Sequence, residues 1–536
     1  MKTIKGNIVD IVNKKIFKGE IYFTNIIHDI VEKDVEDEIY IMPGFVDSHI
    51  HIESSMLTPF EFSKYAIKHG TVAIVTDPHE IANVCGLDGI NFMINNAKEA
   101  KIKIFFTVPS CVPATNFETS GATINAETVK KLLSKNKFVA LSEMMNFPGV
   151  INNDEEVIKK IKYANDLKKP IDGHAPQLSG ENLKKYIEAG ISTDHECSTI
   201  EEAIEKIKLG MKIQIRNGSA AKNFDTLAPL IDIYPNSVML CSDDLHPDDL
   251  INGHINLLVN KAFTYNLNYF NVLRAASYNT IKHYNLNVGL LQKNDPADFI
   301  VCSDKYANTI LKTFINGIEQ KNYKTTSVNF NLINNWNNPT LSIEDLKIPK
   351  SKYIRVIKCF DGELLTKEII RKYDEVFEKE NQLRQGYDKI VVINRYNNAK
   401  PIVGIIEGIS LRDGAFGSTV AHDSHNILIT GHNDLSILNV FNAIVENKGG
   451  LAVSINNYTT SLPLPIGGLI STDDCLVVGK KYKELQTFVT DFLGSALKAP
   501  FMTLSFMALL VIPEIKIGDK GIFKINELKF VDLTIN

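Results

Sequence analysis

The sequence predicts an α/β fold: a (β/α)8 TIM-like barrel with a small flanking β-sandwich unit and a C-terminal α+β domain. Eight apolar, strand-like runs alternate with helical stretches between residues 43 and 285, which is the rhythm of a closed parallel barrel. The 536 residues exceed what one such barrel needs, and 44% hydrophobic with 23% charged residues is typical of globular chains. We therefore expect a barrel with additions at both ends.

The eight runs are expected to be the barrel strands, with a helix between each pair. In chain order they are Gly44–His49, Thr71–Asp77, Ile102–Val108, Phe138–Glu143, Pro170–His174, Gly190–His195, Met211–Ile215 and Ser237–Asp243. In barrels of this kind the chemistry lies where strands end and the following loops begin. Polar residues at the ends of these runs are therefore the candidates for function.

Strand-like segments on both sides of the barrel are expected to form the small β unit. Residues 1–42 contain three such segments, and residues 286–335 contain two more, at Asp295–Val301 and Lys312–Gly317. Chain ends of a domain tend to lie near each other at its surface, so we expect the two sets to pair. The polar residues 329–338 are the best candidate for a linker.

Residues 345–536 are expected to form the α+β domain. Four strand-like runs and one helical run predict it, at Lys389–Asn394, Ile402–Ile406, Asn426–Thr430, Leu451–Ile455 and Lys480–Leu493.

Composition excludes several classes of partner. The 58 Lys and Arg against 63 Asp and Glu give a net charge of −5, which provides no general attraction for nucleic acid or an anionic membrane. The apolar stretch Phe501–Pro513 is shorter than the roughly 20 residues that span a bilayer, and residues 1–20 lack the apolar core of a secretory signal. We expect a cytoplasmic protein that binds neither nucleic acid nor membrane.

Six metal-ligand residues fall at the ends of predicted strands: His49, His51, Glu143, His174, His195 and Asp243. In an extended segment residues i and i+2 point the same way, so His49 and His51 can reach one ion. One open catalytic zinc normally takes three protein ligands. Six therefore favour two divalent ions with a bridging hydroxide, and imidazole with carboxylate suits Mn, Fe or Zn.

Several longer motifs resemble those of bacterial adenine deaminases, a family within the amidohydrolase superfamily. The matching segments are Gly44–Pro59, Thr76–Val84, Glu143–Val150, Asp172–Pro176, Thr193–Glu196, Ser242–Pro247, Ser418–Asn426 and Leu462–Leu469. The resemblance implies a metal-dependent hydrolase that acts on the cyclic amidine C–N bond of adenine, giving hypoxanthine and ammonia in purine salvage. It also implies two divalent ions, Mn²⁺ or Fe²⁺ first and Zn²⁺ as a further option.

The resemblance assigns roles to individual residues. His49, His51, His174, His195 and Asp243 match the superfamily's metal ligands, and Glu143 stands where many relatives carry a carboxylated lysine that bridges the ions. Asp243 and Glu143 are the expected catalytic residues, with Asp243 as the general base. A departure occurs at the next position, where several relatives have histidine and this chain has Asp244.

Four further residues are expected to contact the purine: His79, Glu80, Asp244 and His246. For His79, Glu80 and His246 a helix-capping role is the alternative. The segment His422–His425 could form a turn, bind another ion or reach the barrel mouth.

The predicted function is thus adenine deamination, with adenine as the small-molecule partner and a homo-oligomer, a dimer, as the assembly. Two alternatives stay open. One is another amidohydrolase activity, such as that of a cyclic-amide hydrolase; Glu143 argues against it, since such enzymes usually carry the bridging lysine. The other is a noncatalytic purine-binding barrel.

Overall fold

The computed structural model describes residues 1–219, 222–321, 331–361 and 363–536. The chain forms two compact units. The barrel unit contains residues 1–78, 93–110 and 125–330, and the C-terminal unit contains residues 79–92, 111–124 and 331–536. Residues 322–330, which include the start of the expected linker, lie outside the described residues. The domain boundaries expected from the sequence stay a prediction.

All eight expected barrel strands are present and run in the expected order. They are β5 (Phe45–His51), β6 (Thr71–Thr76), β7 (Lys103–Val108), β8 (Phe138–Met144), β9 (Ile171–Gly173), β10 (Thr193–Asp194), β11 (Lys212–Arg216) and β12 (Val238–Cys241). Strands β5 to β9 pair in parallel, as do β10 to β12. The predicted barrel is confirmed.

Two connections close the ring of strands. The Ser192 N–H donates to the Ile171 carbonyl oxygen at 2.9 Å, which joins the start of β10 to β9. Strand β13 (Asp243–Asp244) continues from β12 and pairs in parallel with β5. Closure therefore brings the carboxyl ends of the first and last strands side by side.

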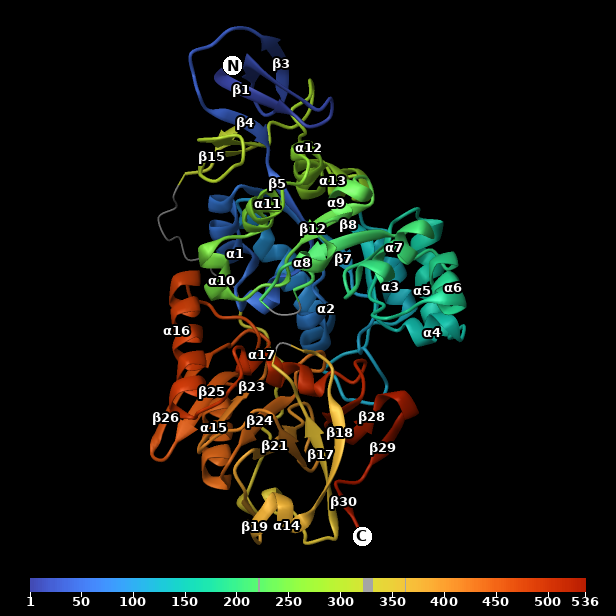
Figure 1. Ribbon diagram of the computed structural model, residues 1–536, viewed down its shortest axis with the longest axis vertical. Helices are drawn as coiled ribbons and strands as arrows, with labels where there is room; N and C mark the ends of the chain where they lie inside the picture. The colour runs from blue at the N-terminus through green and yellow to red at the C-terminus, as the bar shows by residue number, and fades with distance from the viewer. Residues whose placement is uncertain (220–221, 322–330, 362) are drawn as a thin grey trace. The chain divides into compact units, whose positions relative to one another are not determined.

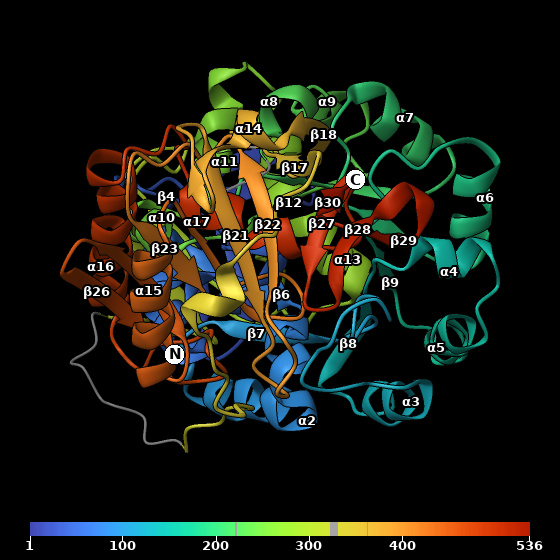
Figure 2. The ribbon, with the colours of Figure 1, turned by 90° about the horizontal axis from the view of Figure 1, so that it is seen from below.

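Helices alternate with the barrel strands. They are α1 (Pro59–Ala66), α2 (His79–Asn96), α3 (Ala126–Leu133), α4 (Phe147–Ile151), α5 (Glu155–Asp166), α6 (Gly180–Glu188), α7 (Ile200–Lys208), α8 (Phe224–Leu227), α9 (Leu230–Ile233), α10 (Pro247–Asn252), α11 (Ile255–Thr264), α12 (Tyr269–Leu273) and α13 (Asn279–Tyr284). In Figures 1 and 2, α3 to α6 lie outside β8. Helix α5 shows why they form: Asp154 caps its first N–H groups, and Val157, Ile161 and Ala164 give it a buried face.

A seven-stranded sheet joins the two flanking segments. Its strands are β1 (Lys2–Asp10), β2 (Lys15–Phe23), β3 (Ile27–Glu32), β4 (Tyr40–Pro43), β14 (Phe299–Cys302), β15 (Ile310–Ile315) and β16 (Ile318–Glu319). Strand β14 pairs antiparallel with β4, so the expected pairing is confirmed. Phe23, Phe299 and Phe314 meet in the core of this sheet, with the Phe299 and Phe314 rings stacked at 4.5 Å.

The C-terminal unit is built on a nine-stranded sheet. Its strands are β17 (Tyr353–Lys358), β18 (Lys367–Lys372), β21 (Tyr387–Ile393), β22 (Ile402–Glu407), β23 (Ala415–Ser418), β24 (Ile427–Gly431), β25 (Gly450–Ile455), β26 (Tyr458–Pro463) and β30 (Thr534–Ile535). Figure 2 shows α15 (Asp434–Glu446) and α16 (Cys475–Thr487) on one side, and β27 (Ile515–Gly518), β28 (Gly521–Lys524) and β29 (Lys529–Val531) on the other. The predicted α+β domain is confirmed.

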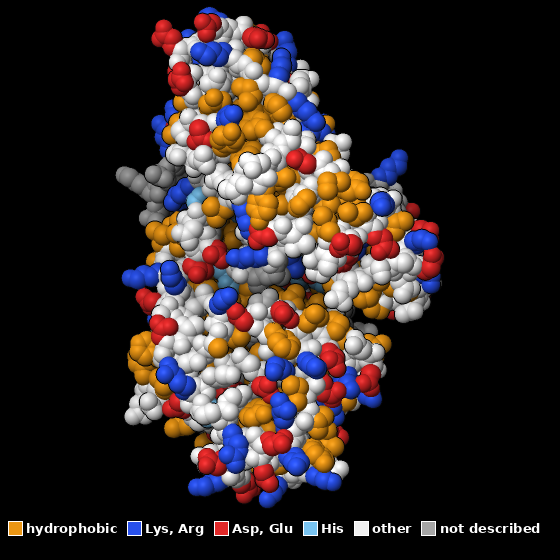
Figure 3. All heavy atoms as spheres, viewed as in Figure 1, with side chains coloured by type: hydrophobic (Ala, Val, Ile, Leu, Met, Phe, Trp, Pro, Cys, Tyr) orange, Lys and Arg blue, Asp and Glu red, His pale blue; other side chains and the backbone are white. Residues whose placement is uncertain are grey.

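The long apolar stretch near the C-terminus is an internal element. Residues 501–510 are buried and include most of α17 (Pro500–Ser505). Among the described residues no helix combines the length and apolar character needed to cross a membrane. On the face shown in Figure 3, cationic and anionic side chains are interspersed.

Candidate metal centre

Six buried side chains converge at the carboxyl ends of the barrel strands. We call them the barrel cluster: His49, His51, Glu143, His174, His195 and Asp243. Strand β5 supplies two of the imidazoles and β8 supplies the glutamate, while the others come from the residues that follow β9, β10 and β12. The His49 and His51 rings lie 4.8 Å apart, as the alternation along β5 requires. The structure therefore brings together all six residues that the sequence singled out.

Glu143 lies at the middle of the barrel cluster. Its Oε2 is 2.8 Å from His174 Nδ1 and 3.3 Å from His195 Nε2. Its Oε1 is 3.2 Å from His51 Nε2 and 4.0 Å from His49 Nε2. Burial opposes its charged form, but hydrogen bonds from three of these imidazoles hold the pKa of Glu143 well below its usual range. Each carboxylate oxygen thus faces one pair of imidazoles.

Asp243 uses its two oxygens differently. Oδ1 is 3.3 Å from His51 Nε2 and 3.5 Å from His49 Nε2. Oδ2 accepts a hydrogen bond from the Arg216 guanidinium. Burial opposes the charged carboxylate, but the Arg216 charge and the imidazoles hold the pKa of Asp243 well below its usual range. One oxygen is therefore engaged by a cation while the other faces the histidines.

Arg216 and Glu196 belong to this site and were missed at the sequence level. The Arg216 guanidinium donates two hydrogen bonds to the Glu196 carboxylate, at 2.6 Å and 2.9 Å, and both residues are buried. Burial opposes the charged form of Glu196, but the Arg216 charge outweighs it and lowers the pKa of Glu196 to about 2. Arg216 ends β11 and Glu196 follows β10 by two residues. The rule that functional residues lie at strand ends could have found both.

The donor atoms of the barrel cluster fit divalent ions. His49 Nε2, which faces the Glu143 and Asp243 carboxylates, is buried with no hydrogen-bond partner among the described residues, an arrangement that costs free energy unless something occupies the lone pair. One donor group joins His49, His195 and Asp243, and a second joins Glu143, His174 and His195, with the donor atoms of each group within 4.8 Å of one another. Neutral imidazole with carboxylate is the ligand chemistry of Mn, Fe and Zn.

Asp244 and His246 lie beside the barrel cluster in the chain. Ser54 Oγ donates to Asp244 Oδ1 at 2.5 Å, and Asp243, directly before it, has a left-handed backbone with φ of 55°. His246 is buried just before α10, and its backbone N–H donates to Ser219 Oγ at 2.7 Å. The left-handed turn at Asp243 directs the two adjacent carboxylates to different neighbours.

His79 and Glu80 open helix α2 and belong to the C-terminal unit. There the Glu80 carboxylate contacts two histidines far along the chain, His422 and His425. Glu80, His422 and His425 thus form a second buried group of histidine and carboxylate, which we call the Glu80 cluster.

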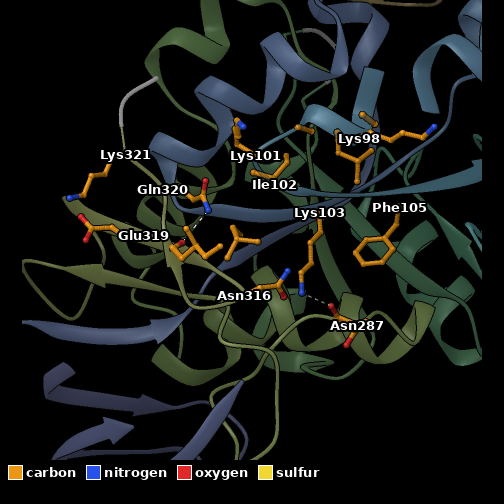
Figure 4. Close-up of a pocket in the computed structure, with 15 residues that line it drawn as sticks. Lys98, Lys101, Ile102, Lys103, Phe105, Asn287, Asn316, Glu319, Gln320 and Lys321 are labelled. Carbon is orange, nitrogen blue, oxygen red and sulfur yellow. Dashed lines mark hydrogen bonds between the residues drawn. The ribbon is translucent and has the colours of Figure 1, made fainter. Parts of the chain in front are cut away.

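A cavity of about 930 Å³ lies elsewhere on the barrel unit. Figure 4 shows Lys98, Lys101, Lys103, Asn287 and Gln320 among its lining residues. It lies at the amino end of β7, whereas the barrel cluster lies at the carboxyl ends of the strands. Lys103 Nζ is already engaged by Asp298 at 2.6 Å and by the Asn287 carbonyl oxygen at 2.8 Å. This cavity lacks the donor set of a hydrolytic site.

Known proteins resemble the chain over its whole length. The Amidohydrolase family matches residues 40–319, and the Adenine deaminase C-terminal domain matches residues 363–529. A protein named adenine deaminase from Methanosarcina barkeri is 48% identical over 99% of both chains, and one from Borreliella burgdorferi is 46% identical over 99% of both. The chain belongs to the adenine deaminase family.

Solved structures to which this member of the adenine deaminase family is similar are more distant in sequence. A β-aspartyl dipeptidase from Fervidobacterium islandicum is 15% identical with a TM-score of 0.46, and covers 61% of this chain and 100% of its own. A dihydropyrimidinase from Brevibacillus agri is 11% identical with a TM-score of 0.47, and covers 59% of this chain and 95% of its own.

Proposed function

We propose that the chain catalyses the hydrolysis of adenine to hypoxanthine and ammonia, as part of purine salvage. The observation that carries the proposal is the similarity to proteins named adenine deaminase over 99% of the chain. The barrel cluster supports it, because replacing the C6 amine of a purine by oxygen requires water to be activated as a nucleophile. Adenine and water are consumed, and hypoxanthine and ammonia are released in equal amounts.

The barrel cluster would hold two divalent ions, one near His49, His51 and Asp243 and one near His174 and His195. Glu143 has one oxygen toward each imidazole pair, which suits a bridging ligand. Mn²⁺ or Fe²⁺ is the proposed metal, with Zn²⁺ as the further option. Bound ions of this kind supply the Lewis acidity that makes water a competent nucleophile at neutral pH.

Asp243 is proposed to move the proton. Arg216 holds Oδ2, so Oδ1 is the oxygen that takes a proton from the attacking water and returns it to a purine nitrogen or to the departing amine. The Arg216 guanidinium is itself held by two hydrogen bonds to Glu196. It therefore prevents the Asp243 carboxylate from rotating. Asp243 thus keeps one oriented acceptor atom throughout the reaction.

Four residues are proposed to contact the purine: His79, Glu80, Asp244 and His246. Adenine offers both N–H donors and ring-nitrogen acceptors, so carboxylates and imidazoles together match its hydrogen-bonding edge.

A homodimer is proposed for the assembly, and sedimentation of the purified chain measures it.

Ammonia release from a substrate panel tests the proposed function. The metal-loaded chain is offered adenine, adenosine, cytosine and dihydroorotate in parallel, and each reaction is repeated with a chelator. We expect ammonia from adenine alone and none after chelation. Adenine left unchanged by metal-loaded protein would reject the proposal, and turnover of dihydroorotate instead would assign the barrel to cyclic-amide hydrolysis.

A further inference from the structure

A buried ion pair adjoins the two loops that carry His174 and His195. Lys206 and Asp194 are both 0% exposed, and Lys206 Nζ donates to Asp194 Oδ2 at 2.5 Å. The lysine lies on α7, where its Nζ also donates to Glu202 Oε1 at 2.7 Å, and the aspartate ends β10 directly before His195. All five residues belong to the barrel unit, so the contacts between them are internal to it.

The ion pair holds both main-chain groups of Ala175, the residue that follows His174. The Ala175 N–H donates to Asp194 Oδ1 at 3.1 Å, and the Ala175 carbonyl oxygen accepts from Lys206 Nζ at 2.7 Å. The N–H belongs to the peptide unit between His174 and Ala175, and the carbonyl belongs to the next one. Because each peptide unit is planar, these two hydrogen bonds fix the course of the backbone directly after His174.

The same aspartate holds the backbone around His195. Asp194 Oδ1 also accepts from the Glu196 backbone N–H, two residues on, at 3.3 Å. This closes a turn with His195 at its centre, of the kind that aspartate side chains commonly form. The pair thus constrains the backbone at two predicted ligands of one donor group, that of Glu143, His174 and His195.

His174 and His195 need such support because their strands are short. Strand β9 has three residues and β10 has two, and each histidine lies just past the last of them. His49 and His51 instead lie inside the seven residues of β5, which pairs with β13 on one side and β6 on the other. Strand hydrogen bonds therefore hold one pair of imidazoles, whereas the other pair depends on side-chain contacts.

We propose that Lys206 and Asp194 are positioning residues, which hold His174 and His195 in the geometry that binds one of the two divalent ions. The inference rests on the two-ion centre of the proposed function and names what supports one half of it. Distances between a metal and its ligands vary by only about 0.2 Å. Imidazoles on loosely held loops would therefore bind an ion less tightly than imidazoles that are oriented in advance.

Manganese titration tests the proposal without turnover. The metal-free full chain and its Lys206→Met variant are titrated with Mn²⁺, and the free ion is measured by electron paramagnetic resonance. We expect Lys206→Met to bind one ion ~10- to 100-fold more weakly, the scale on which residues that support a metal ligand act. The affinity for the other ion should change by less than ~3-fold. Two unchanged affinities, or two that fall equally, would overturn the proposal.

Lys103→Met is the matched control. Lys103 pairs with the buried Asp298 at 2.6 Å in the same unit, but at the amino end of β7, so its loss should leave both Mn²⁺ affinities unchanged. A loss as large as in Lys206→Met would contradict a specific role for the pair. If Lys206→Met has no cooperative unfolding transition, Asp194→Leu combined with Lys206→Met replaces it, because neither member of the pair is then left as an unpaired charge.

Ligand variants identify which ion is weakened. In His49→Ala the ion that remains is the one near His174 and His195, so adding Lys206→Met should weaken it by ~10- to 100-fold. In His174→Ala the same addition should change the affinity for the remaining ion by less than ~3-fold. The reverse pattern would place the effect at the other ion and overturn the proposal.

The outcome separates this inference from the proposed function. A chain that binds two ions as expected but releases no ammonia from adenine rejects the proposed function and leaves the positioning role standing. An active chain whose Lys206→Met variant binds both ions as tightly as before rejects only the positioning role.

Discussion

The molecule contains two buried groups of histidine and carboxylate, and they are built for different chemistry. In the barrel cluster, His49 Nε2 faces two carboxylates and is buried without a hydrogen-bond partner among the described residues. In the Glu80 cluster, His425 uses both ring nitrogens, one as acceptor from a backbone N–H and one as donor to the carboxylate. The same residue types therefore form an ion-binding site in one unit and a hydrogen-bonded carboxylate in the other.

The difference shows that residue types alone do not decide whether a group of histidines and carboxylates binds a metal ion. A histidine binds a metal through a lone pair, and the hydrogen bond at its other nitrogen decides which nitrogen carries that lone pair. In both units, the potential ligand atoms of three such residues lie within 4.8 Å of one another. The hydrogen bonds at the ring nitrogens are what distinguish the barrel cluster from the Glu80 cluster.

Metal removal is the strongest test of this contrast. A chelator should abolish ammonia release, and reloading should give two ions per chain by elemental analysis. His174→Ala should reduce the content to one ion or fewer, because it removes a ligand from one donor group. His422→Gln is the matched variant in the other unit and should leave two ions bound. A third ion that disappears with His422→Gln would break the comparison.

Asp243→Asn should have the next largest effect. The amide keeps the shape of the side chain but cannot accept the proton, so we expect kcat to fall by ~10²- to 10⁴-fold with the unfolding transition retained. Asp244→Asn is the control, since the neighbouring carboxylate is engaged by Ser54. If Asp244→Asn has the larger effect on kcat, the proton carrier is Asp244.

Arg216→Met should destabilise the barrel unit. It leaves Glu196 and Asp243 as buried carboxylates without their cation, which costs about 3–5 kcal/mol in comparable sites. Urea unfolding of the metal-free chain at pH 7 measures the change. Arg371→Met breaks a partly exposed pair with Glu407 and should cost less than ~1 kcal/mol. Equal losses would show that Arg216 does not balance the buried charges.

The smallest predicted effect is a pH dependence in the Glu80 cluster. An unfolded chain protonates His425 near the ordinary value of 6.5, whereas in the folded chain its pKa is about 4. Above pH 6.5 His425 therefore does not lower the free energy of unfolding. As the pH drops toward 4 its protonation in the unfolded chain lowers that free energy, by about 2 kcal/mol at pH 5. His425→Gln removes this contribution, so its free energy of unfolding should fall by that much less between pH 7 and pH 5. Parallel curves would contradict a neutral, buried His425.

Much of the barrel could be predicted from the sequence because its signals are local. Each buried strand appears as an apolar run, and each ligand lies near the end of such a run or just after it, as Glu143 lies in β8 and His174 follows β9. Strand β23 (Ala415–Ser418) escaped prediction because it has four residues and no alternation of polar and apolar side chains. Strand β3 was missed because it is mostly exposed and lacks an apolar stretch.

The sequence left parts of the candidate site unassigned for two reasons, which are residue type and long-range contact. Arg216 is not a metal ligand type, so a search for imidazoles and carboxylates passed over it although it ends β11. Glu80 and His422 are 342 residues apart, and no local pattern connects them. The fold alone brings such residues together, so sequence reasoning left the segment His422–His425 with several open roles.

The path of the chain between the two units has a consequence for its synthesis. Residues 79–92 and 111–124 pack with the C-terminal unit, whose main body begins only at Asn331. More than 200 residues must therefore leave the ribosome before these two segments meet their partners, a wait of roughly 10–40 s at ordinary elongation rates. During that time Ile81 and Val84, which end up fully buried, remain exposed on the nascent polypeptide. The protein should therefore depend on chaperones during translation more than a barrel whose segments fold in the order in which they emerge.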